Sequence, residues 1–230
     1  MQSDLSRRAF LTTLTLALSS LLFMGMLVAR MAYTGEPRYR FFIWNLFLAW
    51  VPFACAFFAY RLHRYAERSS IGRRLFTALF LLAWLVFFPN APYVATDFIH
   101  WQQGLDVLAF YDLVMILLYV ITGLVLGALS LYLAHAIVEY ALGPVMGWLF
   151  VLGISAAGGL GIYIGRFLRW NSWDLALNPD DVLRDVLSRF MHPIANARSI
   201  LFVLMMTAFV FCVYVLVKSL AGMKLVTRES

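Results

Sequence analysis

Long apolar runs recur along the whole chain, and they constrain its fold more than any other feature. Each run holds about 20 residues, the length that an α-helix needs to cross a hydrocarbon layer about 30 Å thick. Lipid offers backbone N–H and C=O groups no partners, so such runs must be helical. The sequence therefore predicts an all-α, polytopic membrane helix bundle with about six transmembrane helices, at residues 10–29, 41–60, 74–89, 107–134, 145–166 and 197–219.

Composition agrees with a single transmembrane domain over residues 1–230. The chain is 63% hydrophobic and 13% charged, whereas a soluble domain is about half apolar and a quarter charged. The net charge of +6 does not indicate nucleic-acid binding, because arginines and lysines cluster at the ends of the runs, where they anchor helices. Membrane lipids are the expected partners. Cys55 and Cys212 fall inside runs and predict no disulfide framework.

Arginine also orients the helices. The segment RLHRYAERSSIGRR, residues 61–74, packs five arginines between two runs, and a short loop this basic stays on the cytoplasmic side. The sequence thus predicts cytoplasmic N- and C-termini. Eight of the twelve acidic residues then fall on the outer side, which is where any chemistry is expected: Glu36, Asp97, Asp106, Asp112, Asp174, Asp180, Asp181 and Asp185.

The third run ends in the stretch FFPNAPYVATDFIHW. Pro89 and Pro92 each lack an N–H and clash one turn back, so the helix is expected to break there. A short re-entrant or interfacial helix should follow Pro92, unless that segment instead completes the third span. On this helix Tyr93, Asp97 and His100 share one face, at the spacing i, i+4, i+7.

The pair Asp97 and His100 can share a proton or ligate a metal. A metal site needs three or four ligands, however, and these are two. The alternative is a capped helix lying at the membrane interface. The inner side holds a comparable group, His135, Glu139 and Tyr140, which we interpret as the polar end of a helix.

Two polar groups lie inside apolar runs near the outer side. Asp112 follows Tyr111 in the first turns of the fourth run, and Asn45 lies about one turn inside the second run. An ionisable group at such depth costs a few kcal/mol unless it is paired, and a buried amide also needs a partner. Asp112 is therefore either a favourable charge at a helix start or a member of a buried network.

The stretch GRFLRWNSWD follows the fifth run. Its arginines, Arg166 and Arg169, are natural partners for the outer acids through forked hydrogen bonds, and its tryptophans are typical of an aromatic belt. Further on, NPDD starts an amphipathic surface helix near 180–191, expected to form a rim or a lid. Glycine pairs at GxxxG spacing, 143/147 and 161/165, predict close helix packing within the chain.

Four elements occur in one order along the chain: WNLFLAWVP, FFPNAPYVATDFIHW, YDL and GRFLRWNSWD. With them the chain resembles the bacterial integral-membrane family catalogued as domain of unknown function 1361. The resemblance implies a multi-helix protein of the bacterial inner (plasma) membrane and supplies no reaction. It divides the single domain into a first span with an outer loop (1–39), a family-like core (40–218) and a cytoplasmic tail (219–230).

The leading functional hypothesis is a membrane-embedded hydrolase acting on a lipid-like substrate at the outer face. No cofactor is identified, and a divalent metal at Asp97 and His100 is the candidate. The catalytic candidates are Asp97, His100, Asp112 and Asp174, with His192 as a further one. The substrate-binding candidates are Asn45, Asn90, Tyr93, Tyr111, Arg166, Arg169, Trp170 and Asn171.

Two alternatives stay open, so the sequence does not decide whether the protein is an enzyme. The first is a non-catalytic structural or assembly protein, in which the same polar groups form a hydrogen-bonded plug. The second is a small transporter or ligand-binding membrane protein, since broken helices line binding sites in transporters. The absence of an internal repeat counts against a transporter.

Overall fold

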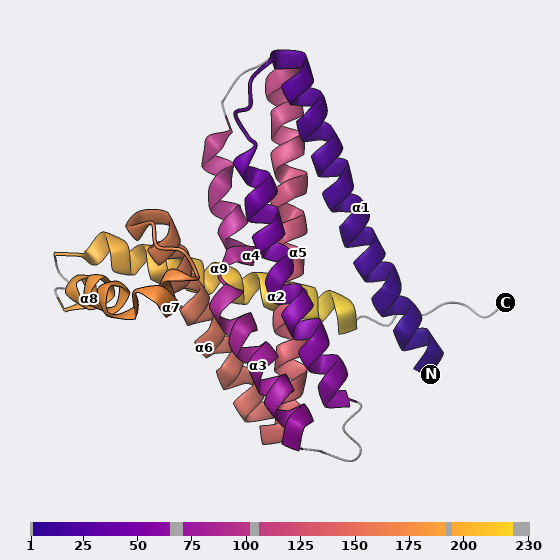
Figure 1. Cartoon of the computed structure of the whole chain (residues 1–230), viewed down its shortest axis with the longest axis vertical. Helices are drawn as coiled ribbons and strands as arrows, with labels where there is room; N and C mark the ends of the chain where they lie inside the picture. Colours follow the sequence, from indigo (N-terminus) through magenta and orange to yellow (C-terminus); the bar gives the residue numbers. More distant parts are fainter. Residues whose placement is uncertain (1, 65–70, 102–105, 192–194, 223–230) are drawn as a thin grey trace.

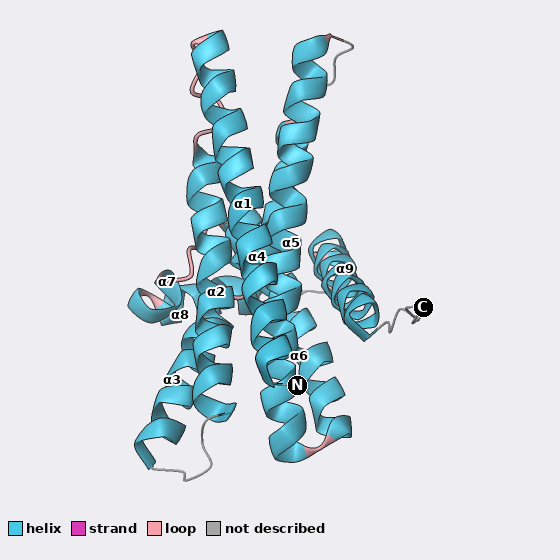
Figure 2. Cartoon of the chain, turned by 90° about the vertical axis from the view of Figure 1, so that its right-hand side faces the viewer, coloured by secondary structure: helices cyan, strands magenta, loops and turns pink. Residues whose placement is uncertain are grey.

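The computed structural model describes residues 2–64, 71–101, 106–191 and 195–222, and these residues form helices joined by short loops (Figures 1 and 2). Six segments are long and apolar enough to cross a membrane, which confirms the predicted all-helical, multi-pass architecture. The elements are α1 Gln2–Thr34, α2 Phe41–Arg64, α3 Ile71–Phe87, α4 Asn90–Tyr93, the 3₁₀ helix η1 Val94–His100, α5 Val107–Leu142, α6 Pro144–Tyr163, the π-helix η2 Ile164–Leu168, α7 Asp174–Leu177, α8 Pro179–Phe190 and α9 Ala197–Gly222.

Helices α1, α2 and α5 stand roughly upright in Figure 1, and α9 runs across them. We call the upper end of this view, where residues 35–40 and η1 lie, the η1 end. Figure 2 shows α9 foreshortened beside the upright helices, so the two views agree that it is transverse. The predicted span at 197–219 is thus present as a helix but is not aligned with the others.

The predicted break at the prolines is present as a short turn, since α3 ends at Phe87 and α4 begins at Asn90. Pro89 has helical φ and ψ of −60° and −24°, and the Tyr93 N–H donates to its carbonyl at 3.0 Å. The chain therefore continues through α4 into η1, and Ile71–His100 qualifies as one candidate span. The short helix predicted after Pro92 is thus present, and by length and hydropathy this segment can also complete the third span. Its placement relative to the membrane stays a prediction.

Glycines on α6 and η2 let neighbouring elements approach closely. A Cβ on Gly161 would lie 2.5 Å from the Pro89 ring, and one on Gly165 would lie 3.4 Å from the Tyr93 ring. A Cβ on Gly159 would lie 2.7 Å from the Val203 carbonyl of α9. These contacts confirm the predicted close packing for the pair 161/165. Of the pair 143/147, Gly147 packs against the His135 side chain, whereas a Cβ on Gly143 would meet nothing within 4 Å. The close approach at Gly159 explains how α9 can cross α6.

Replacing Gly159 with alanine should therefore destabilise the protein. The new methyl group would meet backbone atoms of α9, which cannot rotate away as a side chain can, and overpacking of this kind costs about 1–3 kcal/mol. Gly153→Ala is the matched control on the same helix, because a Cβ there meets nothing within 4 Å. Thermal unfolding in a mild detergent measures both, and equal unfolding temperatures would contradict the close contact.

Helix α8 confirms the amphipathic helix expected near 180–191. Val182 on α8 is buried, whereas Leu183 and Leu187 are exposed. Asp185 accepts a hydrogen bond from the Trp170 indole at 2.9 Å, which ties α8 to the segment after η2. Its placement on the outer membrane surface, as a rim or lid, stays a prediction.

Candidate functional site

The centre of the site is Asp97, whose side chain is 1% exposed. Its Oδ2 accepts hydrogen bonds from Asn45 Nδ2 and the Tyr119 hydroxyl, each at 2.8 Å. Its Oδ1 lies 3.2 Å from Nη1 of Arg166. A buried carboxylate needs this degree of pairing to remain charged, so Asp97 joins α2, η1, α5 and η2 in one network.

Arg166 contacts all three residues of the polar face predicted for the segment after Pro92. Its Nη1 donates to the Tyr93 hydroxyl at 3.3 Å, and its Nη2 lies 3.3 Å from Nε2 of His100. Tyr93, Asp97 and His100 do share one face, since each contacts this guanidinium. His100 differs from Asp97 in being exposed.

Asp112 belongs to a second buried ion pair. Arg30 of α1 donates two hydrogen bonds to its carboxylate, from Nε to Oδ1 at 3.0 Å and from Nη2 to Oδ2 at 3.2 Å. The two side chains are 3% and 7% exposed. This result supports the network interpretation of Asp112. Arg30 was not among the site residues predicted from the sequence, because it directly follows the predicted run at 10–29, where an arginine is typical of a helix anchor.

An aromatic stack lies between the two ion pairs. The ring of Phe42 stacks on Tyr39 at 5.4 Å and on Tyr119 at 4.7 Å between centroids. Tyr39 also lies under the Arg30 guanidinium, and its hydroxyl donates to the His100 carbonyl at 3.4 Å. Burial and the nearby Asp112 carboxylate raise the pKa of Tyr39.

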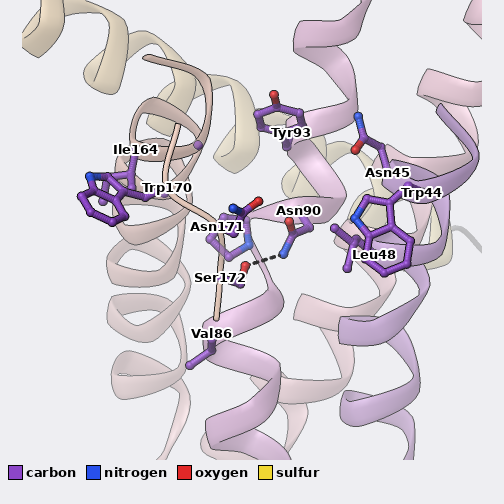
Figure 3. A pocket seen from close by; sticks show the side chains of 13 residues that line it. Trp44, Asn45, Leu48, Val86, Asn90, Tyr93, Ile164, Trp170, Asn171 and Ser172 are labelled. Atoms are coloured by element: carbon purple, nitrogen blue, oxygen red, sulfur yellow. Dashed lines mark hydrogen bonds between the residues drawn. The ribbon is translucent and has the colours of Figure 1, made fainter. Parts of the chain in front are cut away.

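A pocket of about 140 Å³ with a mixed polar and apolar lining lies beside the Asp97 network, between α2, the α3–α4 junction and the end of α6. Figure 3 shows Asn90 near its middle, with Asn171 and Ser172 to one side and Trp44 and Asn45 to the other. Asn90 Nδ2 donates to Ser172 Oγ at 2.8 Å. Five predicted substrate-binding residues line the pocket: Asn45, Asn90, Tyr93, Trp170 and Asn171.

The remaining candidates lie elsewhere. Asp174 accepts from the Asn171 backbone N–H at 2.6 Å, a local turn that starts α7. The Tyr111 hydroxyl donates to the Met26 carbonyl at 2.7 Å and so anchors α1. Arg169 is exposed and has a left-handed φ of 61°. His192 and residues 223–230 of the predicted tail lie outside the described residues.

Within the described part of the chain, no group of three or more His, Cys, Asp or Glu side chains is arranged to hold a metal ion. Both Asp97 oxygens already accept hydrogen bonds. Asp97 and His100 also contact a guanidinium, which disfavours a cation between them. The predicted metal ligands and catalytic roles therefore stay predictions without further support.

The group at the end of α5 opposite the η1 end is more than a polar helix end. His135 is 1% exposed and its Nδ1 is hydrogen-bonded to the Tyr214 hydroxyl of α9. Lys218 Nζ lies 3.3 Å from the same nitrogen, and Glu139 lies 3.4 Å from Nε2. The Lys218 ammonium can only donate, so Nδ1 is assigned as the acceptor and the ring proton to Nε2, on the side of Glu139. This cluster fastens α9 to α5.

Comparison with known proteins gives one match. A family model described as "Protein of unknown function (DUF1361)" matches residues 44–213. No curated protein and no solved structure matches the chain. The matched region contains Asp97, Asp112, Arg166 and the whole pocket lining, whereas Arg30 lies before it.

Proposed function

This chain belongs to the DUF1361 family of membrane proteins of unknown function, and we propose that it binds a polar ligand in the pocket between α2, α4 and the end of α6. One observation carries the proposal. Five residues that the sequence marked as substrate-binding, from separate parts of the chain, line the same pocket. Pockets with a few convergent polar groups are the usual ligand sites of proteins.

The buried network holds two side chains of this pocket in place through hydrogen bonds. Asn45 is held by Asp97 at 2.8 Å, and Tyr93 is held by Arg166 at 3.3 Å. Binding groups fixed by such supporting contacts lose little freedom when a ligand binds, which raises affinity. In this proposal Asp97 and Arg166 are positioning residues. The hydrogen-bonded plug considered from the sequence then supports ligand binding by fixing Asn45 and Tyr93.

Hydrolysis of a lipid-like substrate is a second candidate, favoured by the exposed His100 imidazole beside Arg166. An imidazole can act as a general base, and a guanidinium can stabilise a developing anion. Asp97 would orient Arg166 without touching the substrate, because it is enclosed. A release assay with an ester-linked phospholipid, run on wild type and His100→Gln, distinguishes the candidates: release that depends on His100 supports hydrolysis.

The proposal places the η1 end on the outer face of a bacterial inner membrane. The arginine-rich segment between α2 and α3 supports cytoplasmic placement of the opposite end, and with it cytoplasmic termini. The pocket lies toward the η1 end of α2, since Trp44 and Asn45 are near the start of that helix. Its ligand would then reach the protein from the outer leaflet or from outside the cell.

We expect a cysteine at Ser172, inside the pocket, to be protected by ligand. In a chain with Cys55→Ala and Cys212→Ala, maleimide should label Ser172→Cys severalfold more slowly once a total polar lipid extract is added to the delipidated protein, because labelling reports the unoccupied fraction. Ser188→Cys on α8 is the control, since Ser188 is exposed and lies outside the pocket. Equal rates with and without extract would contradict binding.

The same two cysteines test the orientation in intact cells. A membrane-impermeant maleimide that fails to label either cysteine would contradict placement of the η1 end on the outer face.

A further inference from the structure

We propose that the ligand of this pocket is an uncharged, hydroxyl-bearing headgroup, of the kind that a glycosyl lipid presents. This inference rests on the proposed function and adds the chemical class of the ligand. It is carried by the charge of the lining, the direction of its amide groups and one exposed indole ring.

The lining is electrically neutral. Among the described residues that form it there is no carboxylate, ammonium, guanidinium or imidazole group. Arg166 is not among these lining residues; it donates to the Tyr93 hydroxyl at 3.3 Å, and its charge is balanced by Asp97 at 3.2 Å. A phosphate or carboxylate would enter this pocket without a counter-charge, at a cost of several kcal/mol. An uncharged ligand avoids that cost.

The amide groups of Asn45 and Asn90 present oxygen to the pocket. Asn45 must direct its nitrogen to the Asp97 carboxylate, and Asn90 must direct its nitrogen to the Phe87 carbonyl, because each acceptor needs an N–H. Figure 3 shows the Asn45 oxygen pointing toward the side on which Asn90 and Tyr93 lie. Each Oδ1 is therefore left as an acceptor, which an anion cannot satisfy and a hydroxyl can.

The hydroxyl groups of the lining complete this pattern. Ser172 Oγ accepts from Asn90, and the Tyr93 hydroxyl accepts from Arg166. Each keeps its own proton to donate. The pocket thus offers acceptors and donors side by side, and a hydroxyl group, which both donates and accepts, matches both.

Trp44 adds an aromatic surface at the pocket. It is 53% exposed, and within the described chain its indole N–H has no hydrogen-bond partner. An aromatic face packs on the C–H groups of a sugar ring while its polar edge stays free to donate. The pocket volume of about 140 Å³ accommodates several water molecules and hence a small headgroup.

The test is a binding titration by native mass spectrometry on the full chain, delipidated in a polyoxyethylene detergent that carries no sugar. The probes are monoglucosyl diacylglycerol, phosphatidylglycerol, phosphatidylethanolamine and free maltose. We expect the glucolipid to bind most tightly of the three lipids. Trp44→Leu should weaken it about tenfold, the equivalent of one aromatic contact.

Trp173→Leu is the matched control and should change affinity less than twofold, because Trp173 is 39% exposed and lies outside the pocket. Ser172→Ala is a second variant inside it and should also weaken the glucolipid.

The outcomes separate the two proposals. Maltose binding as tightly as the glucolipid supports the class and identifies a free sugar as the source. Trp44-dependent binding that is tighter for phosphatidylglycerol or phosphatidylethanolamine overturns the uncharged class and leaves the binding function standing. If no probe binds in a manner that depends on Trp44 or Ser172, both proposals are overturned.

Discussion

Replacing Arg166 with methionine is expected to destabilise the protein by about 3–5 kcal/mol, because it leaves the Asp97 carboxylate buried without its counter-charge. Asp97 is 1% exposed and Arg166 is 16% exposed, so solvent cannot replace the lost partner. Methionine keeps most of the apolar stem of the arginine, which limits the loss of packing. The change in unfolding free energy, measured by titrating mild detergent with a denaturing one, tests this expectation.

Arg184→Met is the matched control for this prediction. Arg184 lies 3.5 Å from Asp181 on α8, and the two side chains are 78% and 59% exposed. Exposed pairs of this kind contribute about 0–1 kcal/mol. Equal losses from the two substitutions would show that the Asp97–Arg166 pair is not buried as the structure has it. Arg166→Met with Asp97→Asn should recover much of the loss, because the remaining amide is neutral.

The Asp97–Arg166 pair also shows how far the sequence could predict the site. An acid and two arginines near the ends of apolar runs were enough to predict pairing at one end of the bundle. The choice of Arg166 over Arg169 was not predictable. It depends on the π-helical turn η2 and on the left-handed Arg169 that follows, and a hydropathy pattern predicts neither feature.

The fold shows the same division between local pattern and long-range packing. The hydrophobic run predicts helix α3, and its two prolines predict where the helix is interrupted. Only the path of the chain past the prolines had to come from the structure. The transverse α9 was not predictable, because hydropathy measures the length of a span and carries no direction. Its course depends on the close contact of Gly159 with Val203 and on the hydrogen bond from Tyr214 to His135.

Substitutions at Arg30 and Asp112 are expected to show a reversal of sign. In the natural chain, Asp112→Asn should be destabilising, because it removes the counter-charge of a buried guanidinium. In a chain with Arg30→Met, the same Asp112→Asn should be stabilising, because it neutralises a carboxylate that no longer has a partner. Removing the arginine of a buried ion pair costs about 3–5 kcal/mol of unfolding free energy. Adding Asp112→Asn should restore a large part of that loss.

The single substitutions should also differ in size. After Asp112→Asn, Arg30 keeps Thr34 Oγ1 at 3.3 Å and Glu36 at 4.0 Å, and its long stem can carry the charge toward solvent. Asp112 has a short side chain and cannot reach solvent, so Arg30→Met should cost more. Unfolding free energies of the four chains give the coupling energy directly. A double variant no more stable than Arg30→Met alone would contradict the reversal. Arg30 precedes the residues matched by the family model, 44–213, whereas Asp112 lies inside them. A reversal would therefore also show that α1 contributes to the stability of the family-like core.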